Sequence, residues 1–186
     1  MSRAYRIRVK ESLRRVLRAH DRVSTQLEIL EVLPADQMAE LLASELEKRG
    51  FERDGNELTR EEEGVRVTVD VTTGTVTVSA ETEESVELQR ERTGSSYTPD
   101  DQTVERQLRE TAQREMEAEA EAQTETLQSE VTDRLEKQLG NLRRELDQAV
   151  NRVTAEALKQ KAGKLGQIKE MTEDEETGSL TIVVEV

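Results

Sequence analysis

The longest regular pattern in the chain is a helical spacing of apolar residues between about Asp101 and about Ala162. This stretch has no proline and a single internal glycine, Gly140. In its second half, apolar residues recur every three or four positions, which is close to a heptad repeat. The pattern predicts a long, charged, coiled-coil-like helix. We expect its apolar residues to form an interface, and they are Val131, Leu135, Leu139, Leu142, Leu146, Ala149 and Val153.

The predicted helix is long for a chain of this size. At about 1.5 Å of rise per residue, an unbroken helix of this length spans roughly 90 Å. We expect that the rest of the chain cannot bury it alone, so that it packs on another copy, on a partner, or on itself by bending at Gly140. Both a straight and a bent helix remain open. The first half, especially Glu115 to Glu125, is rich in alanine and glutamate, which predicts a helix that packs poorly.

The amino-terminal residues predict a small antiparallel sheet. Alternation of apolar and charged residues from Tyr5 to Val9 indicates a strand, and the segments on either side of His20 and Asp21 suggest a hairpin with its turn there. A second hairpin is predicted from the valine alternation between Val65 and Ala80.

One helix is expected to cover a face of this sheet. Pro34 fits the first turn of a helix, and Gly50 follows its end. Its apolar stripe consists of Met38, Leu41, Leu42 and Leu46.

A β-hairpin is predicted at the carboxyl end. Segments 167–171 and 179–186 flank turn residues at Glu176 to Gly178. Leu180, Ile182 and Val184 would share one apolar face, and we expect this interface face to dock on the amino-terminal sheet of the same chain or of a neighbour. The predicted fold class is therefore α+β. It comprises an α+β domain at 1–92, a linker at 93–100 (turn residues from Thr93), a long helix or helical hairpin at 101–163 and a hairpin at 164–186.

Composition limits the size of the core. Of 186 residues, 33% are hydrophobic, 2% are aromatic and 37% are charged, which leaves little material for a large interior. There is no cysteine, so disulfides and thiolate metal sites are excluded. The sequence shows no signal-peptide core and no apolar run of membrane-spanning length. We expect a soluble, cytoplasmic protein.

Charge is distributed unevenly. The net charge is −14, yet eight basic residues and only two acidic ones lie between Met1 and Arg22. A basic arm can bind nucleic acid, but here the basic residues alternate with apolar ones and lack interleaved aromatic residues. The simpler interpretation is the solvated face of a strand, paired with acidic side chains.

Catalytic and metal-binding patterns are missing from the sequence. His20 is the sole histidine, and neither a Gly-x-Ser-x-Gly elbow nor a phosphate-binding loop is present. The acidic run from Glu173 to Glu176 could bind Ca²⁺ or Mg²⁺, but it lacks EF-hand spacing, so we interpret it as a solvated turn. We expect no enzymatic activity, no cofactor and no metal.

The chain resembles a known family in two places. One is the run from Tyr5 to Glu81, in which Pro34 opens a helix that ends near Phe51; the other is the terminal run from Glu173 to Val186. Both are similar to small accessory proteins of bacterial ternary systems, which combine an FtsH-like or MoxR-like AAA ATPase with a von Willebrand A domain protein and are thought to act in conflict or stress responses. The resemblance implies an adaptor beside an ATPase, with no active site to carry over.

Three functions remain open from the sequence. The first is an oligomeric adaptor or scaffold that binds itself and an AAA ATPase or von Willebrand A domain protein. The second is a prefoldin-like holdase chaperone, which would expose Leu127, Val131 and Leu135. The third is a nucleic-acid binder that uses Arg14, Arg15 and Arg18.

Overall fold

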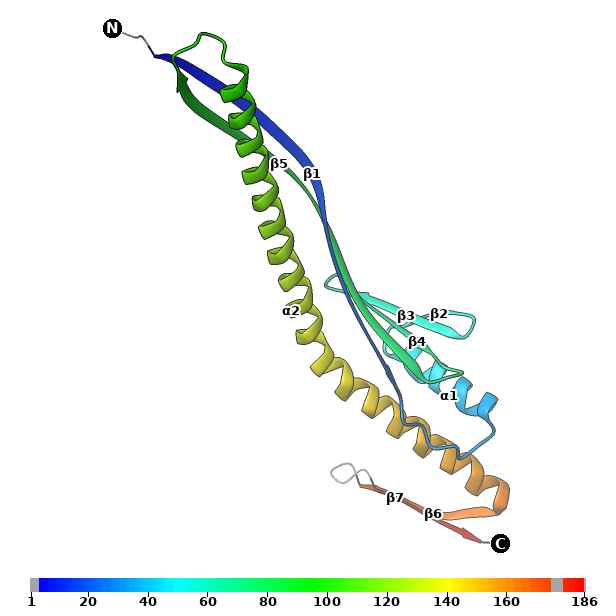
Figure 1. The fold of residues 1–186 in the computed structure, drawn as a ribbon. Coiled ribbons are helices and arrows are strands. Elements are labelled where there is room, and N and C mark those ends of the chain that lie inside the picture. Colours follow the sequence, from blue (N-terminus) through cyan, green and yellow to red (C-terminus); the bar gives the residue numbers. More distant parts are fainter. Residues whose placement is uncertain (1–3, 175–178, 186) are drawn as a thin grey trace. The chain divides into compact units, whose positions relative to one another are not determined.

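A computed structural model describes residues 4–174 and 179–185. In chain order the elements are β1 (Tyr5–Gln26), α1 (Ala35–Lys48), β2 (Glu52–Asp54), β3 (Glu57–Glu62), β4 (Val65–Asp70), β5 (Thr75–Ser96), α2 (Gln102–Leu165), β6 (Gln167–Asp174) and β7 (Ser179–Glu185) (Figure 1). One sheet has the order β1-β5-β4-β3-β2, and β6 and β7 form a second sheet. The α+β prediction is confirmed.

The chain divides into two units. Residues 1–21 and 81–132 form the first unit, and residues 22–80 and 133–186 form the second. Strands β1 and β5 and helix α2 each contribute one part to each unit.

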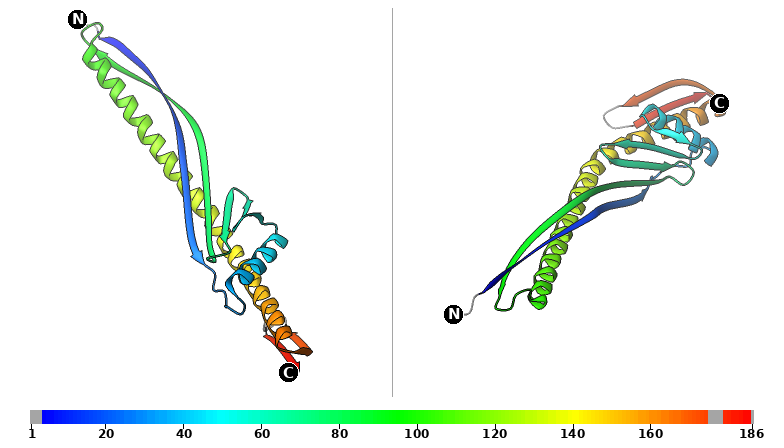
Figure 2. Two further views of the ribbon diagram at one scale, coloured as in Figure 1. Left: turned by 90° about the vertical axis from the view of Figure 1, so that its right-hand side faces the viewer. Right: turned by 90° about the horizontal axis from the view of Figure 1, so that it is seen from above.

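In the first unit, a ribbon of β1 and β5 lies along α2 (Figure 2). Val9, Leu17 and Ala19 of β1 are buried, whereas the residues between them are mostly exposed. This alternation places one face of the strand against the helix. Contrary to the expectation of poor packing, this half of α2 is well packed, since Ala112, Met116 and Ala120 have at most 1% of their surface exposed.

The predicted turn at His20 and Asp21 is wrong, because β1 continues through both residues. The Gln128 side chain donates a hydrogen bond of 3.0 Å to the His20 carbonyl. The Thr132 hydroxyl lies 2.9 Å from Asp21 Oδ2. Two polar side chains of α2 thus hold the strand where the sequence indicated a reversal.

The residues from Thr93 to Ser96 also differ from the linker expected there. They lie in β5, which ends at Ser96. Asp101 then caps α2, since its carboxylate accepts hydrogen bonds from the backbone N–H groups of Thr103 (3.1 Å) and Val104 (3.3 Å). These N–H groups have no partner within the helix, so the carboxylate stabilises its start.

In the second unit, α1 lies beside β2 and β3. Met38, Leu42 and Leu46 are buried on α1, which confirms the predicted helix and its apolar stripe. Strands β4 and β5 pair with Val67 opposite Val78 and Val69 opposite Val76, as the alternation predicted. The buried apolar strand residues of this unit are Leu58, Val65, Val67, Val69, Val76, Val78 and Ala80.

Helix α2 continues through Gly140 without interruption. This excludes a helical hairpin that reverses at Gly140. In the second unit Leu142, Leu146 and Val153 are buried within the single chain. The expectation that this chain cannot bury the helix is therefore wrong.

The carboxyl-terminal hairpin is present as predicted. Strands β6 and β7 pair antiparallel, with Met171 opposite Ile182 and Ile168 opposite Val184, and the register shifts between Ile168 and Glu170. They form their own sheet and do not extend the five-stranded one. The expected turn at Glu176 to Gly178, the second half of the acidic run, and Val186 lie outside the described residues.

Candidate interaction surfaces

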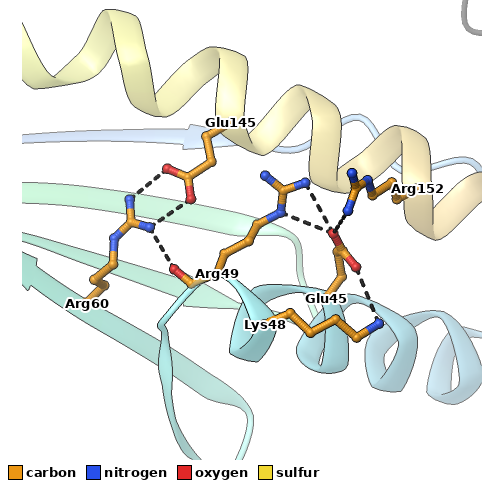
Figure 3. Close-up of polar contacts among 6 residues, drawn as sticks. All are labelled: Glu45, Lys48, Arg49, Arg60, Glu145 and Arg152. Carbon is orange, nitrogen blue, oxygen red and sulfur yellow. Dashed lines mark hydrogen bonds and ion pairs between the residues drawn. The ribbon is translucent and has the colours of Figure 1, made fainter. Parts of the chain in front are cut away.

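A polar cluster connects β3, α1 and α2 in the second unit (Figure 3). Arg60 of β3 donates two hydrogen bonds of 2.7 Å to the carboxylate of Glu145 on α2. A third, of 3.0 Å, goes to the Arg49 carbonyl just after α1. The guanidinium also stacks on Phe51, 4.5 Å from the ring centre. Arg60 thus holds three segments together through one planar group.

The contact between Arg60 and Glu145 favours the charged form of each side chain. The hydrogen bond to Arg60 and its positive charge lower the pKa of Glu145, against the opposing effect of burial. The same hydrogen bond raises the pKa of Arg60. Because each group stabilises the charged form of the other, the pair is ionised at neutral pH.

Glu45 is the centre of a second set of ion pairs beside the first. Its side chain is 9% exposed, and its carboxylate lies 3.1 Å from Arg49 Nη2, 3.5 Å from Lys48 Nζ and 3.6 Å from Arg152 Nη1. Arg152 belongs to α2 and the other two residues belong to the end of α1 or follow it. Throughout the described residues, every buried polar side-chain atom has a hydrogen-bond partner. The cluster therefore connects α1 to α2, and its buried polar side-chain atoms all have hydrogen-bond partners.

The predicted interface stripe of α2 lies mostly in the interior of the chain. Val131, Leu135, Leu142, Leu146, Ala149 and Val153 are buried. Leu139 is partly buried. Leu127, which the chaperone alternative requires to be exposed together with Val131 and Leu135, is 8% exposed. A role for the stripe between chains stays a prediction.

An open groove of about 760 Å³ lies beside Leu139 in the second unit. Its apolar floor includes Val76 and Val78 of β5 and Leu142 of α2, and charged side chains such as Arg143 and Asp147 border it. The sequence pattern did not indicate the groove, because its lining comes from three segments that are distant in the sequence: 23–28, the β5 residues Val76 and Val78, and 139–151.

A ladder of ion pairs runs across β1 and β5 in the first unit. Lys10 contacts Glu91 at 3.5 Å, Arg14 contacts Glu87 at 3.1 Å, and Arg18 contacts Glu83 at 2.8 Å. Both strands advance four residues per rung, so every pair lies on the same exposed face. Lys10, Arg14 and Arg18 of the basic segment therefore lie on a solvated strand face and pair with acidic side chains, as the pattern predicted for that face.

The carboxyl-terminal hairpin exposes apolar side chains. Ile168, Met171 and Val183 are 37%, 46% and 45% exposed. The predicted interface residues Leu180, Ile182 and Val184 are partly buried.

The described part of the chain holds no candidate for two other kinds of site. No group of three or more histidine, aspartate or glutamate side chains there is arranged to hold a metal ion. Among the described helices, none is both long and apolar enough to cross a membrane.

Together these features define an α+β protein with a fully hydrogen-bonded polar cluster and a hairpin that exposes apolar side chains. The family model for FtsH ternary system domain X5 matches residues 1–186. The chain belongs to this family and is a component of the FtsH ternary system, which confirms the resemblance seen in the sequence. Neither a curated protein nor a solved structure matches the chain.

Proposed function

We propose that this chain is a non-catalytic adaptor or scaffold of the FtsH ternary system, and that it binds the AAA ATPase or the von Willebrand A domain protein of that system. The observation that carries the proposal is the match of the family model to the whole chain. The family domain accounts for residues 1–186, so the proposal concerns the described fold as a unit of that system.

The side chains that could carry chemistry have structural contacts. In the polar cluster, Arg60 pairs with Glu145, and Glu45 pairs with Arg49 and Arg152. Arg14 and Arg18 bind acidic side chains across the ribbon. Within each unit these contacts hold the elements together, which supports a structural role for these side chains.

The two other functions have less support. A holdase that clasps clients through Leu127, Val131 and Leu135 needs these residues exposed, and they are buried. A nucleic-acid binder needs basic side chains free for phosphates, and those of the ladder have acidic partners.

Co-purification with the system's own ATPase tests the adaptor function. The tagged chain would be expressed together with the AAA ATPase and the von Willebrand A domain protein, and complexes would be isolated at physiological salt. We expect at least one of them to elute with the chain. A folded chain that elutes without either protein would overturn the proposal.

Variants at an exposed residue of the hairpin and at a partly buried residue of the groove would locate the contact. Met171→Asp changes the hairpin, Val150→Asp changes the groove, and Arg114→Glu on the exposed side of α2 serves as the control. Circular dichroism would confirm that each variant is folded. We expect one of the first two substitutions to weaken binding at least tenfold and the control to leave it unchanged.

A further inference from the structure

The hairpin of β6 and β7 has one continuous apolar face. Ile168 and Val184 are opposite each other in the register, as are Met171 and Ile182, and residues two apart on a strand share a face. Leu180 therefore joins the same face. A two-stranded hairpin is marginally stable in water, and further strands give such a face enough apolar contact.

The two outer edges of this hairpin differ in how strongly they are protected against pairing with a further strand. On β6, Lys169 and Glu170 lie at the register shift, and charge and bulges are the features that protect an edge strand. On β7, the run from Leu180 to Val184 has no charge and no proline, and the extra residue at the register shift, Lys169, belongs to β6 and not to β7. It contains four β-branched residues in succession, from Thr181 to Val184. Among the described residues, the edge of β7 away from β6 pairs with no other strand.

We propose that β7 pairs antiparallel with β7 of a second copy of this chain, so that two hairpins form one four-stranded sheet about a two-fold axis. With Ile182 on the axis, Leu180 of one copy lies opposite Val184 of the other. The apolar faces of the two hairpins then form one surface. This inference goes beyond the adaptor function and does not depend on it.

The lack of charge along most of β7 favours a second copy of the chain as the partner that pairs with this edge. An uncharged strand that pairs with itself brings no like charges together, because Glu185 lies at the end of β7 and falls opposite Ser179 of the other copy in this register. Matched cross-strand pairs of β-branched and aliphatic residues stabilise such a pairing. The contact is isologous, so it closes as a dimer and does not propagate.

Charged substitutions on the other face of β7 test the pairing. Thr181 and Val183 lie on the face opposite Leu180, Ile182 and Val184, so changing them leaves the apolar face intact. Thr181→Lys with Val183→Lys puts like charges opposite each other in the proposed dimer. Thr181→Glu with Val183→Glu does the same with negative charge. Thr172→Lys on β6 is the matched control, because Thr172 is the partner of Thr181 in the hairpin.

Light scattering after size exclusion gives the mass of the purified full-length chain alone. We expect a dimer for the unchanged protein and for the control, a dissociation constant at least tenfold higher for each double variant, and a restored dimer when the two double variants are mixed. An unchanged protein that is monomeric up to about 100 µM, or double variants that dimerise as well as the control, would overturn the inference.

A cross-link keeps the inference testable if the charged variants do not fold. The chain has no cysteine, so Ile182→Cys introduces a single thiol on the proposed axis. Paired residues of antiparallel strands lie about 4.5 to 5.5 Å apart at Cα, within reach of a disulfide. Mild oxidation should give a covalent dimer for Ile182→Cys and a monomer for Thr172→Cys. Equal cross-linking of both variants, or none of Ile182→Cys, would contradict the pairing.

Discussion

Arg60 and Glu145 are 85 residues apart in the sequence, and their side chains form two parallel hydrogen bonds of 2.7 Å. The pair joins the sheet to α2 in the second unit, beside the Glu45 ion pairs that join α1 to α2 (Figure 3). Two parallel hydrogen bonds from a planar guanidinium constrain the orientation of the carboxylate. The pair therefore fixes which turn of α2 lies against β3.

Loss of the Glu145 carboxylate should destabilise the protein. Glu145→Ala leaves the partly buried Arg60 guanidinium without its partner, which costs about 1–3 kcal/mol. Urea unfolding measures the loss. The exposed pair of Arg66 and Glu61, with side chains 65% and 59% exposed, offers a matched control. Glu61→Ala should cost less than about 1 kcal/mol, and equal losses for the two variants would contradict the structural importance of the Arg60 pair.

Stability should depend on pH through Glu145. Its pKa in the folded chain is below the ordinary value of 4.5, chiefly because of the hydrogen bond from Arg60. Because folding lowers this pKa, the ionised carboxylate stabilises the folded chain at pH values above the pKa of the group in the unfolded chain. This stabilisation is lost as the pH falls from about 4.5 through the folded pKa. The difference in unfolding free energy between the unchanged protein and Glu145→Gln should be constant above about pH 5.5 and shrink below pH 4.5. A difference that grows on acidification would refute this.

The apolar stripe of α2 should contribute to folding within one chain. Leu146 is 4% exposed and Leu158 on the same helix is 38% exposed. Leu146→Ala should cost about 2–5 kcal/mol of stability through the cavity that it leaves. Leu158→Ala should cost much less, and thermal unfolding compares them. If Leu146→Ala instead kept the stability of the control but dissociated an oligomer, the stripe would be an interface between chains.

The ladder of ion pairs predicts that the basic segment does not bind nucleic acid. Fluorescence anisotropy with a labelled 20-nucleotide single strand and a matching duplex should show no binding at physiological salt. The variant Arg14→Gln, Arg15→Gln, Arg18→Gln should give the same result and lose little stability, since exposed ion pairs contribute about 1 kcal/mol or less each. Affinity that falls steeply with salt and disappears in this variant would support the nucleic-acid alternative.

Local patterns predicted the elements that depend on neighbouring residues. The helix after Pro34 and the valine hairpin at 65–80 have their signals within a few residues, and both are present. The carboxyl-terminal hairpin was predicted for the same reason. Each of these elements is stabilised by contacts close in sequence, where periodicity is informative.

Contacts between distant residues explain what the sequence did not reveal. Strand β1 runs through His20 because Gln128 and Thr132 of α2 bind it there. Met116 is buried on the same face of α2 as Ala112 and Ala120, two small residues that add little to a count of hydrophobic residues. The Arg60 and Glu145 pair gave no signal, because neither charged residue stands out among 37% charged positions.

The most direct test of the adaptor function is the affinity of the purified chain for the purified AAA ATPase of the same ternary system. Biolayer interferometry would use the full-length chain as the immobilised partner, with the von Willebrand A domain protein measured in parallel. We expect saturable binding to at least one of these two proteins, and this binding should require no catalysis by the chain. A correctly folded chain that binds neither protein at micromolar concentrations would contradict it.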